Sequence, residues 1–186
     1  MKTKHLTRSA LLAFITALTP AAYSESVAAE KPKLELTDSV QPGSLTAMIA
    51  DSVTFSTLTK ALKAAELDVT LGTKGEYTVF APTDEAFGKL PAEVLTKLML
   101  PENKEKLRSL LLYHVVTGKL LAAELKDGDV KTMNGEKLKI DVDGDKIELD
   151  GAKVFSADVP ANNGVMHTIG KVLIPKSLDG FAGLDK

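Results

Sequence analysis

Apolar residues in the first half of the chain recur at helical spacing. Between residues 44 and 67 they repeat every three or four positions, which predicts two helices. The apolar faces are formed by Leu45, Met48 and Ile49 in the first helix and by Phe55, Leu58, Leu62 and Ala65 in the second. Thr54 is placed to cap the second helix. Pro91 and Pro101 suit the first turns of two further helices.

One buried strand is predicted between these helical segments. Residues 77–81 (YTVFA) are apolar and β-prone, and the run stops at Pro82. Thr83 follows as a capping hydroxyl, and Asp84 and Glu85 are acids in a first turn, where the helix dipole favours negative charge. We therefore expect a strand that leads directly into a helix.

The second half of the chain has the alternating pattern of strands. In residues 137–142, Leu, Ile and Val alternate with Lys and Asp, so one face of this strand is expected to contact water. Asn134-Gly135 and Asp143-Gly144 are dipeptides that strongly favour type I′ turns, which predicts hairpins at both places. The predicted strands are residues 130–133, 137–142, 146–149, 152–157 and 165–174, the last two joined by a turn at residues 162–164.

The order of these elements predicts the fold class and the domain limits. Helices come first and an antiparallel meander follows, which indicates an α+β fold with segregated layers and not a parallel βαβ fold. The length of 186 residues fits one domain. We expect this domain at residues 44–175, after a polar linker or flexible arm at 30–43 and before a C-terminal tail at 176–186.

The first 29 residues have the pattern of a secretory signal peptide. Basic residues precede an apolar run at residues 10–18, and small and polar residues follow it. Cleavage after Ala29 is favoured, with Ala28 or the region near Ala22 as alternatives. The run is shorter than the roughly 20 residues that span a bilayer, so no membrane insertion is expected. The predicted location is the periplasm or the cell exterior.

Charge and cysteine content narrow the function classes. The formal net charge is −2, and removal of residues 1–29 lowers it to about −4. Nucleic-acid partners are not expected, because binding them normally requires a basic face. The chain has no cysteine, which excludes disulfides, thiol nucleophiles and cysteine-ligated metals. Stability must therefore come from the burial of an apolar core.

Three segments together resemble one protein family. They are TVFAPTDEAF at residues 78–87, LLLYHVVTGKL at 110–120 and NGVMHTIGKVLIP at 163–175. In order and spacing the chain is similar to the fasciclin family from about residue 44 to 175. The resemblance implies a β-wedge of about seven strands in two sheets with a helical cluster packed on one side. It also implies cell adhesion, through integrins in animals and less defined partners in bacteria.

The resemblance also indicates particular residues. The Tyr-His segment of the family is implicated in adhesion, which points to Tyr113 and His114 as binding residues. Thr83, Asp84 and His167 belong to the motifs as structural residues. Gly170 departs from the family, which usually has an acid at this place in the third motif. A role of that carboxylate cannot be transferred to this chain.

The sequence offers little support for catalysis or metal binding. His114 and His167 each follow an apolar run, which is typical of hydrogen-bonded histidines in or near a core. Hydrolase, metalloprotease and nucleotide-binding motifs are absent. Asp141 and its acidic neighbours resemble a calcium loop, but Lys146 and Ala152 occupy the positions of the required Gly and Glu. We expect no catalytic residue, no metal and no cofactor.

Three functional hypotheses remain open from the sequence. The first is a non-catalytic adhesion module whose partner is a protein or polysaccharide at a cell surface, in a matrix or on a host. The second is a periplasmic protein that binds a small apolar or polymeric ligand, and the third, more remote, is an uncharacterised hydrolase. A deep apolar pocket would favour the second hypothesis, and a flat surface the first. The oligomeric state is not indicated.

Overall fold

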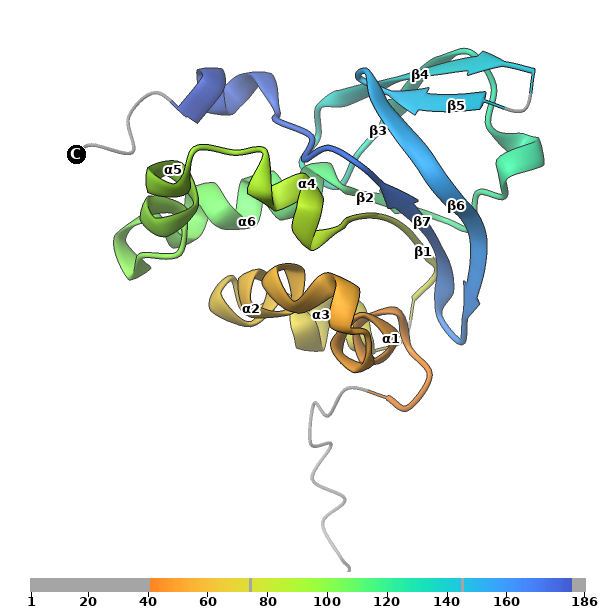
Figure 1. Ribbon diagram of the computed structural model, residues 1–186. Helices are drawn as coiled ribbons and strands as arrows, with labels where there is room; N and C mark the ends of the chain where they lie inside the picture. The colour runs from red at the N-terminus through yellow and green to blue at the C-terminus, as the bar shows by residue number, and fades with distance from the viewer. Residues whose placement is uncertain (1–40, 74, 145, 182–186) are drawn as a thin grey trace, which may run out of the picture. The chain divides into compact units, whose positions relative to one another are not determined.

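The computed structural model describes residues 41–73, 75–144 and 146–181 (Figure 1). They belong to one of the two compact units of the chain, the one from Leu36 to Lys186. The predicted signal peptide at residues 1–29 and residues 30–40 of the predicted linker lie outside the described residues.

Six α-helices and four short 3₁₀ helices are described. The α-helices are α1 (Leu45–Asp51), α2 (Ser56–Ala64), α3 (Asp68–Gly72), α4 (Asp84–Gly88), α5 (Ala92–Leu98) and α6 (Lys104–Tyr113), and the 3₁₀ helices are η1 (Val53–Phe55), η2 (Pro101–Asn103), η3 (Ala122–Glu124) and η4 (Lys176–Phe181). The sequence did not predict α3, because it is too short to show a period. The prediction that Thr54 caps the second helix is wrong, since Thr54 lies inside η1 and α2 has no cap from its preceding residue.

Seven strands form one hydrogen-bonded array in the order β2-β1-β7-β6-β5-β4-β3. They are β1 (Tyr77–Pro82), β2 (Val115–Thr117), β3 (Gly128–Lys131), β4 (Lys137–Asp143), β5 (Lys146–Leu149), β6 (Ala152–Ala161) and β7 (Gly164–Ile169). The long strand β6 pairs with β7 in one half of the array and with β5 in the other, so it connects the two halves of the wedge (Figure 1).

The antiparallel meander predicted for the second half of the chain is confirmed, but β1, for which the sequence indicated no partner, forms one parallel pair. Strands β1 and β7 are parallel, with Tyr77 opposite Gly164 and Pro82 opposite Ile169. All other strand pairs are antiparallel. The sequence order could not reveal this pair, because three α-helices, two 3₁₀ helices and five strands are described between β1 and β7. Their pairing depends on how these elements pack together.

The turn at Asn134-Gly135 differs from its prediction. Lys131 pairs with Lys137, which leaves residues 132–136 between β3 and β4. Gly135 has a positive φ of 92°, but Asn134 does not have a positive φ. A type I′ turn requires positive φ at both central residues, so residues 132–136 form a longer loop in which only Gly135 has a positive φ.

The type I′ geometry occurs instead at a dipeptide that the sequence analysis did not single out. Asp150 and Gly151 join β5 to β6 and have φ of 46° and 72°. The hairpin between β4 and β5 is present as predicted, but Asp143 is paired with Lys146 and belongs to the strand. Its turn therefore begins one residue later than predicted.

Two apolar clusters lie on opposite faces of β1. Val79 and Ala81 contact the helical cluster, whereas Phe80 faces the interior of the wedge. The second cluster consists of Phe80, Tyr113, Val116, Leu125, Leu138, Ile140, Leu149, Ala152, Ile169 and Leu173. In Figure 1 the helices gather on one side of the β1, β2 and β7 half of the array. Strand β1 is therefore buried on both faces, which explains its continuous apolar run.

The segment after β7 packs against the domain. Leu178 in η4 is buried in the helical cluster. The backbone N–H groups of Lys176 and Ser177 donate to the Glu136 carboxylate at 2.9 and 3.2 Å. Residues 176–181, which we expected to be a tail, are thus held by side-chain contacts. Within the described residues, no helix is both long and apolar enough to span a membrane.

Candidate functional site

Tyr113 and His114 lie at the end of α6, inside the protein. Tyr113 is the last residue of the helix and His114 is its C-cap. Each side chain is only 2% exposed. Both side chains are therefore largely shielded from a partner, and their clearest contacts are with other parts of the fold.

The Tyr113 side chain holds the turn between β5 and β6. Its hydroxyl donates a hydrogen bond to Asp150 Oδ2 at 2.6 Å, and the Lys137 carbonyl oxygen lies 3.1 Å away. Burial, together with the hydrogen bond to the Asp150 carboxylate and its charge, raises the pKa of Tyr113 well above its usual range. The phenol therefore stays protonated and keeps donating to the turn.

The His114 side chain holds the segment that follows β7. Its Nε2 accepts a hydrogen bond from the Leu173 N–H at 2.9 Å, so Nδ1 carries the proton and donates to the Leu110 carbonyl oxygen at 2.8 Å. Burial lowers the pKa of His114 to about 4. The ring is thus neutral at ordinary pH and has a single tautomer. Both ring nitrogens are occupied by backbone partners.

An open groove of about 240 Å³ lies between the two segments that this pair holds. Its lining consists of Tyr113, Asp150, Lys171, Val172, Leu173, Ile174 and Lys176. Asp150 belongs to the segment held by Tyr113, and Leu173 to the segment held by His114. Two adjacent residues of one helix end therefore determine both sides of the groove.

Thr83 and Asp84 act at helix N-termini and do not line this groove. Thr83 Oγ1 accepts from the Ala86 N–H at 3.2 Å and caps α4. The Asp84 carboxylate accepts from the N–H groups of Ser56 and Thr57 at 3.2 and 2.8 Å, at the start of α2. Burial acts to raise the pKa of Asp84, but these hydrogen bonds outweigh it and hold the pKa below its usual range.

His167 is fully buried in β7. Its Nδ1 accepts from the Asp158 N–H at 3.3 Å and its Nε2 lies 2.9 Å from the Leu120 carbonyl oxygen. Its ring stacks on Phe80 with a centroid separation of 5.5 Å. Burial lowers the pKa of His167, as it does that of His114. The two histidines share no hydrogen-bond partner and do not form a pair.

Comparisons with known proteins show the family to which the chain belongs. Residues 53–175 match the family model described as Fasciclin domain. The chain belongs to the fasciclin family. It is 42% identical over 170 residues to Protein sll1483 of Synechocystis sp., a match that covers 90% of this chain and 93% of that protein. It is 38% identical over 126 residues to transforming growth factor-beta-induced protein ig-h3 of Sus scrofa, covering 67% of this chain and 18% of that protein.

A solved structure shows the same fold. The structure of a domain pair from the insect cell adhesion molecule fasciclin I aligns with a TM-score of 0.64 at 16% identity. The alignment covers 72% of this chain and 51% of that chain. The α+β fold with its β-wedge of seven strands, expected from the sequence motifs, is thereby confirmed.

Gly170 of this fasciclin domain lies beneath an aromatic side chain. A Cβ atom built on Gly170 would lie 2.2 Å from Cε2 of Phe155, so the absence of a side chain makes room for the ring. Phe155 on β6 is 68% exposed. Sequence analysis did not single out Phe155 or Asp150. The sequence does contain one feature that could have indicated Asp150, because Asp150-Gly151 is an Asp-Gly dipeptide of the kind that favours a type I′ turn.

Metal binding receives no support from the described part of the fasciclin domain. None of its His, Asp and Glu side chains gather in groups of three or more that could hold a metal ion. In the β4–β5 hairpin Asp141 and Asp143 are exposed and Glu148 is half-buried, and lysines are interspersed with them. Lys139, for example, forms an ion pair with Asp141 on the same face of β4.

Proposed function

We propose that this fasciclin domain is an exported, non-catalytic binding module that mediates contact with a protein or polysaccharide at a cell surface or in an extracellular matrix. The observation that carries the proposal is the groove whose two sides are held by Tyr113 and His114. The fold similarity to a domain pair of an insect cell adhesion molecule supports it at the level of the fold.

The way in which the groove is held suits binding. Its sides are fixed by hydrogen bonds from buried side chains, so little conformational freedom remains to be lost when a partner binds. The exposed charges of Asp150, Lys171 and Lys176 are available to select that partner. In this proposal Tyr113 and His114 position the surface, and the exposed residues around them make the contact.

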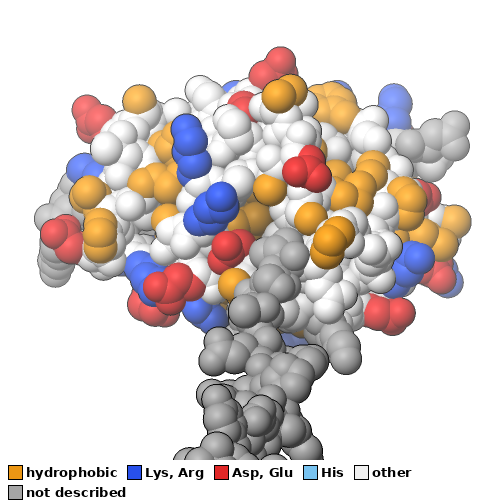
Figure 2. Space-filling model, turned by 90° about the horizontal axis from the view of Figure 1, so that it is seen from below, with side chains coloured by type: hydrophobic (Ala, Val, Ile, Leu, Met, Phe, Trp, Pro, Cys, Tyr) orange, Lys and Arg blue, Asp and Glu red, His pale blue; other side chains and the backbone are white. Residues whose placement is uncertain are grey.

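A binding site for a small apolar ligand is less well supported. An apolar groove of about 220 Å³ is lined by Thr46, Ala50, Thr59, Leu62, Lys63 and Asp68. It is smaller than the roughly 300 Å³ at which small-molecule pockets usually begin. Figure 2 shows hydrophobic side chains interspersed with charges of both signs on the face of the helical cluster. The neutral, fully bonded histidines likewise argue against a hydrolase.

The proposal is tested by binding of the labelled, purified protein to intact cells and to isolated matrix of the producing organism and its hosts. Lys176→Glu reverses a charge on the side of the groove and should lower the bound amount several-fold, whereas Lys60→Glu makes the same change on the exposed surface of α2 and should not. Both variants should melt like the wild type. No binding by the wild type, or an equal loss in both variants, would contradict the proposal.

A further inference from the structure

Phe155 is presented to solvent by an irregularity in β6. Val154 pairs with Ile169 and Ser156 with Thr168, so β6 has one residue more than β7 at this point and forms a β-bulge at Phe155. A bulge bends its strand and changes the direction of a side chain. Here it leaves a large aromatic side chain 68% exposed.

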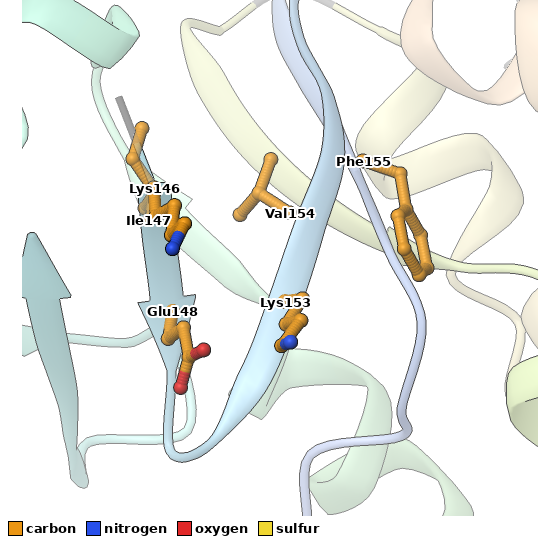
Figure 3. A pocket seen from close by; sticks show the side chains of 6 residues that line it. All are labelled: Lys146, Ile147, Glu148, Lys153, Val154 and Phe155. Carbon is orange, nitrogen blue, oxygen red and sulfur yellow. The ribbon is translucent and has the colours of Figure 1, made fainter. Parts of the chain in front are cut away.

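The same bulge lies beside a groove between β5 and β6. Pairing of these strands ends at Glu148 and Lys153, although both strands continue. The groove has a volume of about 180 Å³ and is lined by Lys146, Ile147, Glu148, Lys153, Val154 and Phe155. In Figure 3 Val154 lies between the strands, and the Phe155 ring lies on the side of β6 away from β5. The ring is thus at the border of the groove.

A glycine is required at position 170 because of the space that the Phe155 ring occupies, and not because of the backbone conformation. Its φ is not positive, so the backbone there would accept other residues. A side chain would instead collide with Phe155, whose ring atoms lie 2.2 and 2.7 Å from an ideal Cβ. An acidic side chain at this place would also add a negative charge beside the ring. Gly170 therefore leaves room for the Phe155 ring and introduces no charge next to it.

Lysines surround this aromatic residue. Lys89 Nζ donates to the carbonyl oxygen of Gly170 at 2.7 Å, and Gly170 is the residue against which the Phe155 ring packs. Lys153 shares the groove lining with Phe155, and Lys171 follows Gly170 and lines the neighbouring groove at Tyr113. All three lysines are exposed. We call Phe155, Lys89, Lys153 and Lys171 the basic-aromatic patch.

The patch stands out against the charge of the chain, which is −2. Lys146 adds a further positive charge across the groove, and Glu148 is the one acid in the groove lining. Glu148 pairs with Lys153 across the strands. Three further acids, Asp127, Asp141 and Asp143, line an adjoining groove that includes Lys146 and Lys153 but not Phe155. The positive excess is therefore limited to the Phe155 side, where Lys89, Lys153 and Lys171 lie next to Gly170 and the exposed ring, and this side is complementary to a ligand with spaced anionic groups and an apolar face.

We propose that the basic-aromatic patch binds an anionic polysaccharide. The carboxylate or sulfate groups of such a chain would meet the lysines, and the apolar face of one sugar ring would lie on Phe155. An acidic peptide strand fits less well, because bulges disrupt the edge of β6 to which it would add. The inference rests on the proposed function, since it names the partner class of the same module.

The test measures binding of the purified protein to alginate, dextran sulfate and uncharged dextran by calorimetry. We expect alginate or dextran sulfate to bind and dextran not to bind, with affinity that falls as salt is added. Preference for alginate assigns a uronate chain, and preference for dextran sulfate a sulfated one. Phe155→Ala and Lys153→Glu should each weaken binding about tenfold. Gly170→Asp should weaken it as strongly, by adding charge and displacing the ring.

Matched variants separate this site from net charge. Lys60→Glu makes the same charge change on the exposed surface of α2, at a residue that lines neither groove, and should alter affinity by less than about twofold. Glu148→Gln should strengthen binding, because it removes the one acid from the groove lining. Thermal denaturation of every variant shows that it is folded. Equal weakening by Lys60→Glu, unchanged binding of Phe155→Ala, or equal binding of dextran overturns the proposal.

One further outcome overturns the inference, and two others distinguish it from the proposed function. Binding of poly-glutamate as tight as that of alginate would assign the patch to an acidic polypeptide and overturn the polysaccharide proposal. Attachment to cells that depends on Lys176 but not on the basic-aromatic patch contradicts this inference alone. Polysaccharide binding by a protein that attaches to no cell or matrix contradicts the proposed function alone.

Discussion

Tyr113 and His114 are neighbours in the sequence but hold different parts of the fold. One reaches the turn at Asp150 and the other reaches the backbone at Leu173. The buried polar atoms of the described side chains all have hydrogen-bond partners. Such groups are costly to leave unpaired, so their removal affects stability more than their own contacts suggest.

His114→Ala should destabilise the protein by about 1 to 3 kcal/mol, because the Leu173 N–H and the Leu110 carbonyl oxygen both lose their partner. His167→Ala should have a similar effect through Asp158 and Leu120. For a domain of this size, each 1 kcal/mol lowers the melting temperature by roughly 2 to 4 °C, which thermal denaturation resolves. Wild-type melting of both variants would refute the structural role and favour a search for an activity.

Among the elements, α2 depends on a residue from another helix. Its own preceding residue is Phe55, which supplies no capping side chain. The Asp84 carboxylate from α4 instead accepts from Ser56 and Thr57. The cap therefore also ties α2 to α4, and both pack on the same apolar cluster.

Asp84→Ala should cost about 0.5 to 2 kcal/mol, the usual range for loss of an N-cap, and should reduce the helical signal in circular dichroism as α2 frays. Glu85→Ala is the matched control, because Glu85 is an exposed acid in the same first turn of α4. An Asp84→Ala protein as stable as Glu85→Ala would show that the contact contributes nothing to α2.

For the whole molecule, buried neutral histidines and bonded carboxylates make stability depend on pH. The pKa of His114 falls from its ordinary value of 6.5 to about 4 on folding, so below pH 6.5 the unfolded chain takes up a proton that the folded chain does not. Folding stability is thus complete above pH 6.5 and decreases as the pH falls toward 4. The lowered pKa values of Asp84 and Glu136 extend the loss to more acidic pH.

We expect the loss from His114 alone to amount to about 3 kcal/mol between pH 7 and pH 4. Urea denaturation across this range measures it. The His114→Ala variant should be less stable at pH 7 but should lose less on acidification, since it lacks this proton uptake. Stability of the wild type that stays constant between pH 7 and 4.5 would contradict the buried, neutral state of the ring.

The sequence by itself determined the local structure of this protein. The alternation of apolar and polar residues in β4 places the side chains of Leu138 and Ile140 in the protein interior, and the hydroxyl of Thr83 caps the helix that follows β1. These features depend on neighbours within a few residues, so periodicity and capping chemistry reveal them. The motifs of the family, which carry the fold class, are also continuous stretches of sequence.

Only the tertiary structure decided which distant residues meet. The parallel pairing of β1 with β7, the contact of Tyr113 with Asp150 and the seat of Phe155 on Gly170 all join segments separated along the chain. Such contacts result from the packing of whole elements, which no local pattern encodes. The burial of Tyr113 and His114 and their contacts with Asp150 and Leu173 were likewise visible only in the tertiary structure, and their role in binding stays a prediction.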